Sequence, residues 1–149
     1  MPLIVQSPYH TLITFLLTRP KLASSKRHDI SIEEDGFGEK PNCHGTTLFI
    51  LGKYCDRSPY FVSPRRMEDA LGIADTIPKN RHSVISFWVH TTLEHTAIYL
   101  GSDRKGRDVL FHQEDTGRPF GVVPFSNCYY FSSSTHFTFY NPGDIDFST

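Results

Sequence analysis

The chain has 149 residues, of which 38% are hydrophobic and 21% charged, so it is long enough for one globular domain with a core, and we expect a single domain over residues 1–149. The formal charge of −1 and the scattered basic residues provide no surface for nucleic acid, which we exclude as a partner. Cys43, Cys55 and Cys128 lack metal-type or redox-pair spacing, which favours a reduced compartment over a disulfide scaffold.

The N-terminal segment is predicted to form an amphipathic helix. Ser7 and Pro8 are typical of a helix start, apolar residues then recur at helical spacing up to Leu17, and Pro20 ends the pattern. The segment lacks the basic leader of a signal peptide and is too polar to span a membrane. We therefore expect no membrane span, and a protein that is cytoplasmic as synthesised or is delivered by a specialised secretion route.

A polar stretch over residues 21–40 predicts a surface loop, followed by an apolar, largely buried helix from Cys43 through Tyr54. Long loops in compact domains are often functional, so Phe37 is a candidate to line a substrate cleft. Asn42 is a favourable N-cap residue for the helix.

Cys43 is the candidate nucleophile because the first residues of a helix carry unpaired backbone N–H groups and partial positive charge, which favour a thiolate. The same N–H groups are suited to an oxyanion, and Asn42 and His44 are candidates to contact the substrate or the oxyanion. Gly45 is a poor residue for a first helical turn, and such a break with local preference is typical of a functional site. The alternative is that Cys43 is a small buried hydrophobic residue.

A second short helix is predicted from Ser63 and Pro64 to Gly72. After it the period changes from helical to extended, which predicts an antiparallel sheet in the C-terminal half and a polar tail over Asp144–Thr149. The predicted strands are Val84–Val89, His95–Gly101, Asp108–Gln113, Phe120–Phe125, Tyr129–Phe131 and His136–Tyr140.

The second and third of these strands are predicted to form a hairpin that brings two histidines together. A hairpin centred on the loop between them pairs Tyr99 with Asp108 and His95 with His112. Opposed residues on one face have Cβ atoms about 5 Å apart, which is close enough for two imidazoles to hydrogen-bond. We expect the start of the Cys43 helix to approach this pair.

A thiol and two imidazoles in this order supply the groups of a cysteine hydrolase. Cys43 would attack a carbonyl, His95 would hold the thiol proton and deliver it to the leaving amine, and His112 would orient His95. Glu114 is the alternative third member, although it lies further along the strand. The eight histidines of the chain make chance pairs easy, and a single strand histidine is more often structural.

Three segments carry a resemblance to a known family. They are Asn42-Cys43-His44-Gly45 before an apolar helix, the strand His95-Thr96-Ala97-Ile98-Tyr99-Leu100-Gly101, and His112 on the next strand. In chain order and spacing they resemble the NlpC-like branch of the papain-fold cysteine peptidases, although His44 stands where that family has serine.

The resemblance implies an α+β, papain-like fold, with N-terminal helices and the cysteine-bearing helix packed on an antiparallel sheet formed by the C-terminal half. It implies hydrolysis of an amide bond through an acyl-enzyme, often in peptidoglycan peptides, with Cys43 as nucleophile, His95 as base and His112 as orienting group. No cofactor or metal is expected. The partners are a peptide or cell-wall peptide and, where the activity is held in check, an inhibitor or immunity protein.

Other functions remain open at this stage. A thiol-dependent deamidase or acyltransferase would use the same residues and differ in what resolves the acyl-enzyme. A non-catalytic binding module is an alternative from another class. A zinc protein that uses Cys43, His95 and His112 is disfavoured, because their spacing matches no closed structural site.

Overall fold

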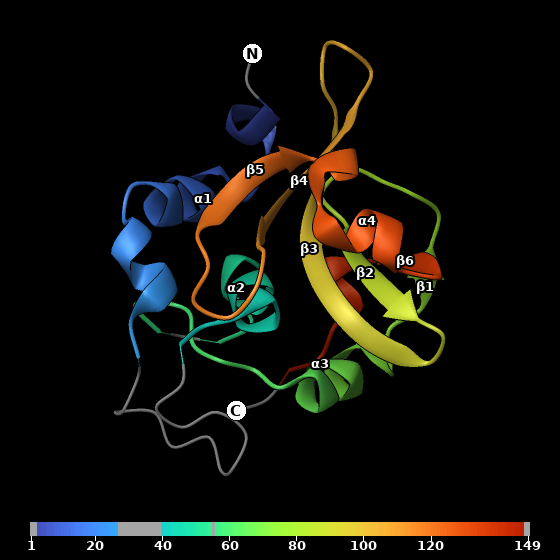
Figure 1. Ribbon diagram of the computed structural model, residues 1–149, viewed down its shortest axis with the longest axis horizontal. Helices are drawn as coiled ribbons and strands as arrows, with labels where there is room; N and C mark the ends of the chain where they lie inside the picture. Colours follow the sequence, from blue (N-terminus) through green and yellow to red (C-terminus); the bar gives the residue numbers. More distant parts are fainter. Residues whose placement is uncertain (1–2, 27–39, 55, 148–149) are drawn as a thin grey trace.

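The computed structural model describes residues 3–26, 40–54 and 56–147, which form an α+β fold (Figure 1). The helices are α1 (His10–Leu17), α2 (Cys43–Ile50), α3 (Pro64–Leu71) and α4 (Tyr129–Ser133), with 3-10 turns η1 (Leu3–Gln6), η2 (Pro20–Ser24), η3 (Phe125–Asn127) and η4 (Pro142–Asp144). The strands are β1 (Thr76–Ile77), β2 (Val84–Val89), β3 (Thr92–Ser102), β4 (Asp108–Gln113), β5 (Phe120–Pro124) and β6 (His136–Tyr140). Among these residues no helix has the length and apolar character needed to cross a bilayer.

The described strands form one six-stranded sheet in the order β1-β6-β2-β3-β4-β5, with every neighbouring pair antiparallel. β2 and β4 have the bounds expected from their apolar and β-branched residues. β1 falls between the predicted helix that ends at Gly72 and the first predicted strand, where no strand was expected, and its two residues pair with the end of β6. This confirms the α+β class and the antiparallel sheet.

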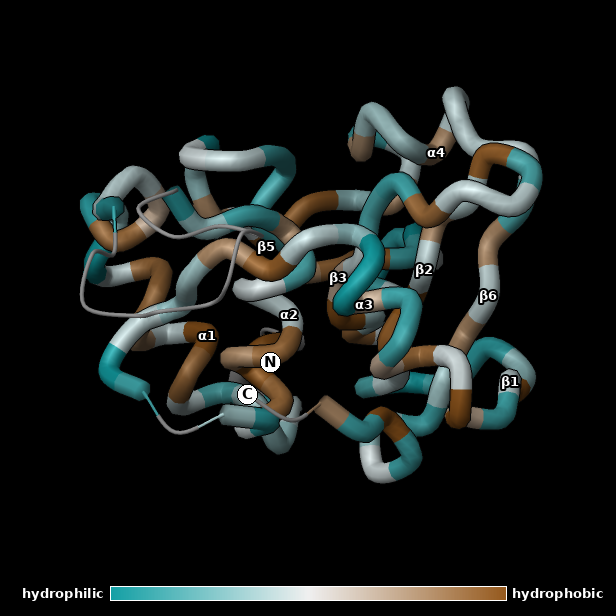
Figure 2. Tube along the Cα trace, turned by 90° about the horizontal axis from the view of Figure 1, so that it is seen from below, coloured by the Kyte–Doolittle hydropathy of each residue, from teal (hydrophilic) through white to brown (hydrophobic). Residues whose placement is uncertain are grey.

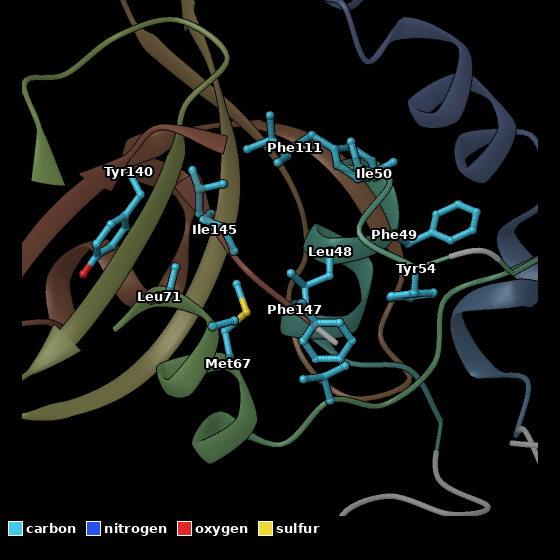
Figure 3. Close-up of a cluster of buried hydrophobic side chains, with 14 of the residues drawn as sticks. Leu48, Phe49, Ile50, Tyr54, Met67, Leu71, Phe111, Tyr140, Ile145 and Phe147 are labelled. Carbon is cyan, nitrogen blue, oxygen red and sulfur yellow. The ribbon is translucent and has the colours of Figure 1, made fainter. Parts of the chain in front are cut away.

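The two faces of the sheet carry separate hydrophobic cores because successive side chains of a strand point to opposite sides. The larger core packs α1, α2 and α3 against side chains such as Ile98 and Phe111 (Figure 3). The hydrophobic stretches of α1 and α2 are visible in Figure 2. The smaller core lies under η3 and α4 and contains Phe87, Leu110 and Cys128.

Helix α2 begins at Cys43, as predicted, and its cap joins two parts of the chain. The Asn42 Oδ1 accepts from the Gly45 N–H at 3.0 Å and the Val62 N–H at 3.1 Å, and its Nδ2 donates to the Val62 carbonyl at 2.7 Å. The helix ends at Ile50 rather than Tyr54, because Gly52 adopts a φ of 71° and its N–H bonds back to the Phe49 carbonyl.

Helix α3 also starts as predicted, with the Ser63 Oγ accepting from the Arg66 N–H at 3.2 Å. Helix α1 starts later than expected, at His10, because the Ser7 Oγ accepts from the Tyr9 N–H at 3.0 Å and holds residues 7–9 in a turn.

Two predictions for the C-terminal region were wrong. Tyr129–Phe131 belongs to helix α4 rather than to a strand, because a helical turn lets Tyr130 pack on Phe87 and His95 beneath it. The second concerns the final segment, which up to Phe147 is not a solvated tail. Ile145 and Phe147 are buried in the larger core, where hydrophobic burial outweighs the polar neighbours (Figure 3).

The predicted register of the β3–β4 hairpin was also wrong. Tyr99 pairs with Leu110, two positions beyond the expected Asp108, and the register shifts again between Tyr99 and Gly101. Gly101 has a φ of 104°, which marks a β-bulge that hairpin symmetry does not reveal. Because a slip of two residues keeps each side chain on its face, His95 and His112 still share one face, as diagonal rather than opposed neighbours.

Candidate active site

The two predicted histidines are in direct contact. The His95 Nε2 lies 2.8 Å from the His112 Nδ1, and the two rings are nearly perpendicular, at 87°. His95 is 0% exposed and His112 is also buried. Neither ring is charged in this setting: burial lowers the pKa of His112 to about 4 and holds that of His95 well below its usual value. One ring donates a hydrogen to the other.

The His95 ring is fixed by aromatic neighbours. Tyr130 of α4 stacks on it with centroids 4.3 Å apart and ring planes 10° from parallel, and Phe87 of β2 lies 5.4 Å away. Its Nδ1 is buried and has no hydrogen-bond partner among the described residues. A buried ring nitrogen without a partner is costly, so this atom is the free position of the pair.

Cys43 lies beside the strand that carries His95, where β3 and β4 separate. The pairing of β3 with β4 begins at Ile98 and Phe111, so Thr96 lies before the paired part of the two strands. The backbone N–H of Thr96 lowers the pKa of the Cys43 thiol, as do the N–H groups of His44 and of Cys43 itself. Helix α2 contacts both β3 and β4 at this opening (Figure 1).

The thiol of Cys43 is protonated, contrary to the expectation from its place at the helix start. The three backbone N–H groups do lower its pKa, as the helix-start argument requires. Burial is the larger effect, since the residue is only 6% exposed, and Asp115 adds repulsion, so the pKa is raised to about 12. The unpartnered His95 Nδ1 also means that no hydrogen bond joins the thiol to that ring.

The other candidates take different places. Asn42 uses its side chain to cap α2 and to hold Val62, as described above. His44 is buried, with its Nδ1 2.9 Å from the Thr96 Oγ1, and burial lowers its pKa to about 3. Phe37 lies outside the described residues. Glu114 makes no hydrogen bond with either histidine in the described part of the chain.

A surface cavity adjoins the histidine pair. It measures about 400 Å³ and is lined by Glu114, Asp115, Arg118, Tyr129 and Tyr130. Tyr130 both lines this cavity and stacks on His95, so it joins the cavity to the histidine pair.

Sequence reasoning missed Tyr130, Cys128 and Gln113. The Gln113 side chain, completely buried, accepts from the Thr46 Oγ1 at 2.6 Å and donates to the Ala23 carbonyl at 2.9 Å, which ties α2 to β4. The Cys128 sulfur lies 4.0 Å from the His112 Nδ1, so Cys128 rather than Cys43 is grouped with the two histidines. None of these three residues belongs to a motif, and only the path of the chain after β5 brings Cys128 close to the two histidines.

Comparison with protein-family models, with curated proteins and with solved structures finds no match to this chain. The interpretation of the site therefore depends on its own geometry.

The three buried neutral histidines predict a loss of stability in acid. In the unfolded chain His44, His95 and His112 bind protons near pH 6.5, whereas in the folded chain they do so only at much lower pH. The unfolded state thus binds more protons below about pH 7, and the free energy of unfolding should fall with pH by about 1.4 kcal/mol per unit for each histidine down to about pH 4. Urea unfolding over this range measures the slope. A His44→Gln variant should show a smaller slope, and a flat profile for the wild type would contradict the neutral assignment.

Proposed function

We propose that the protein is a cysteine hydrolase that cleaves an amide bond, with Cys43 as nucleophile, His95 as base and His112 as the group that orients His95. The observation that carries the proposal is the pairing of the histidines. The Nε2 of His95 is bonded to His112, while its Nδ1 is buried and has no hydrogen-bond partner among the described residues. The next residue on the strand, Thr96, contacts His44 in the first turn of the helix that bears Cys43. A papain-like arrangement fits a cysteine helix packed on an antiparallel sheet.

The proposed reaction begins from a neutral thiol and a neutral imidazole. The His95 Nδ1 takes the proton of the Cys43 thiol as the sulfur attacks the carbonyl carbon. The Nε2–H of His95 donates to the His112 Nδ1, which holds the ring in this tautomer and stabilises the imidazolium. His95 then gives the proton to the leaving amine, and water, activated by the same ring, hydrolyses the thioester.

Backbone groups at the start of α2 are suited to the oxyanion. Of its first N–H groups, that of Gly45 is bonded to the Asn42 side chain and that of Thr46 to the Asn42 carbonyl. The N–H groups of Cys43 and His44 lie beside the sulfur and lower the pKa of the thiol. Once the sulfur is bound to carbon, these two donors are available to the carbonyl oxygen.

The site is closed in this conformation, so substrate must displace part of its cover. Tyr130 is the candidate cover, because it stacks on His95, lines the cavity and is carried by the short helix α4 (Figure 1). We expect Tyr130→Ala to raise the rate at which iodoacetamide alkylates Cys43 by at least about tenfold, because removing the ring exposes the buried site. Peptide mapping after timed labelling measures this rate. Tyr129→Ala, which removes an exposed neighbouring ring, is the matched control, and equal rates in all three proteins would contradict the role given to Tyr130.

The proposed substrate is a peptide or a related amide, and the resemblance noted above favours cell-wall peptides. The test is incubation with purified peptidoglycan fragments and a peptide panel, read by mass spectrometry. Cleavage into two fragments with the gain of one water names the bond. Replacement of an amide NH₂ by OH would instead indicate a deamidase, and a product joined to a second amine a transferase. No Cys43-dependent change in any amide would overturn the proposal.

A further inference from the structure

A second cysteine lies against the histidine pair, where the proposed reaction does not use it. Cys128 stands directly before α4, is 3% exposed and is not part of a disulfide. Its sulfur lies 4.0 Å from the His112 Nδ1, the atom that also faces the His95 Nε2. Within the described residues, these three donor atoms all lie within 4.8 Å of one another.

We propose that His95, His112 and Cys128 form a zinc site in which the metal ion takes the place of the hydrogen bond between the two rings. Imidazole nitrogen and thiolate sulfur are the ligands that zinc prefers. With Zn–N near 2.0 Å and Zn–S near 2.3 Å, tetrahedral geometry separates two nitrogens by about 3.3 Å and nitrogen from sulfur by about 3.5 Å. The two ring nitrogens are 2.8 Å apart, and the Cys128 sulfur lies 4.0 Å from the His112 Nδ1 and within 4.8 Å of the His95 Nε2, so side-chain movements without a change of fold bring the three atoms to these separations.

The charges around the cluster favour a cation. Glu114 follows the ligand His112 by two residues, and the negative charge of its carboxylate attracts a divalent ion. Two neutral imidazoles and one thiolate leave a zinc complex with a net charge of +1. The negative charge of Glu114 partly neutralises this charge. Three protein ligands leave one position of the metal open for water.

Metal binding and the proposed catalysis exclude one another. Binding releases the Cys128 thiol proton, and the hydrogen of the His95 Nε2 moves to its Nδ1 so that Nε2 can ligate the metal. With Nδ1 protonated, His95 cannot accept the proton of Cys43, and zinc is therefore an inhibitor. This regulatory consequence rests on the proposed function, whereas the metal site itself does not.

The binding test uses the full chain with Cys43→Ser and Cys55→Ser, which leaves Cys128 as the remaining cysteine. Titration with Co²⁺ should show one ion per chain with thiolate-to-cobalt charge-transfer absorption. X-ray absorption of the zinc form should show one sulfur ligand near 2.3 Å. The matched variant, Cys43→Ser with Cys128→Ser, should lose both sulfur signals and bind at least about tenfold more weakly. Absence of binding by the first variant, or a sulfur signal that survives without Cys128, would overturn the site.

Inhibition supplies the second readout. Zinc should stop amide hydrolysis by the wild-type protein, and Cys128→Ser should need at least about tenfold more zinc for the same effect. Because the metal titration needs no turnover, failure of the proposed hydrolysis leaves the binding result intact. Hydrolysis by a wild-type protein that binds no metal would refute this inference and leave the hydrolase standing.

Discussion

Replacing Cys43 with serine is expected to lower kcat/KM for amide hydrolysis by at least about a thousandfold while the chain stays folded. Serine fills nearly the same buried space at the start of α2. Its hydroxyl is a much weaker acid than a thiol, so proton transfer to His95 no longer yields an effective nucleophile. Kinetics on the amide identified by mass spectrometry, with circular dichroism as the check on folding, provide the measurement.

The histidines should separate by role in the same assay. His95→Ala removes the group that moves the proton, whereas His112→Ala removes only the partner that orients it, so the first change should cost more activity than the second. Cys128→Ser is the matched control for loss of a buried thiol and should retain metal-free activity. Wild-type turnover by the Cys43→Ser protein would exclude the proposed nucleophile.

Replacing Gly45 with alanine is expected to destabilise the protein by about 3 kcal/mol or more. A Cβ at this position would overlap the backbone carbonyl oxygen of Tyr60, and a backbone atom cannot rotate out of the way as a flexible side chain does. Moving the segment would also strain the bond from the Tyr54 Oη to the Gly45 carbonyl, 2.8 Å long, and the cap bonds between Asn42 and Val62.

Urea unfolding of Gly45→Ala against Gly52→Ala tests this account of close backbone packing. Gly52 has a φ of 71° but nothing within 4 Å of an added Cβ, so alanine there should cost only about 1 kcal/mol for the left-handed conformation. Equal effects of the two substitutions would show that helix propensity, rather than the contact with Tyr60, governs position 45.

The glycine also shows why one sequence argument led to the right place for an incomplete reason. Gly45 is unfavourable in a helix, and this break with local preference was interpreted as a mark of function. The structure gives it a packing role, because α2 can approach the backbone at Tyr60 only where no side chain intervenes. Because Gly45 and Cys43 belong to the same helical turn, the packing at Gly45 also positions Cys43. The glycine itself takes no part in the proposed chemistry.

Local patterns predicted those parts of the fold that depend on neighbours in the sequence. Apolar and β-branched runs gave the bounds of β2 and β4, and Ser63 with Pro64 gave the start of α3. The shared face of His95 and His112 was also predictable, because a period of two is retained even when the register slips by two residues. Their hydrogen bond confirms that these two rings meet.

Features that depend on long-range contacts could not be predicted from local sequence patterns. The bulge near Gly101 sets the register of β3 against β4, and the path after β5 brings Cys128 and Tyr130 over the sheet. The state of Cys43 is decided by a competition: the helix start favours the thiolate, burial opposes it, and burial is the larger effect. The degree of burial cannot be obtained from residue spacing.

The most direct test of the central claim is whether His95 governs the reactivity of Cys43. In a Tyr130→Ala background, where the sulfur is expected to be accessible, the rate of Cys43 alkylation by iodoacetamide near neutral pH should fall by at least about tenfold when His95 is changed to glutamine, because only the imidazole can accept the thiol proton. Equal rates with and without His95 would show that the sulfur and the ring do not act together.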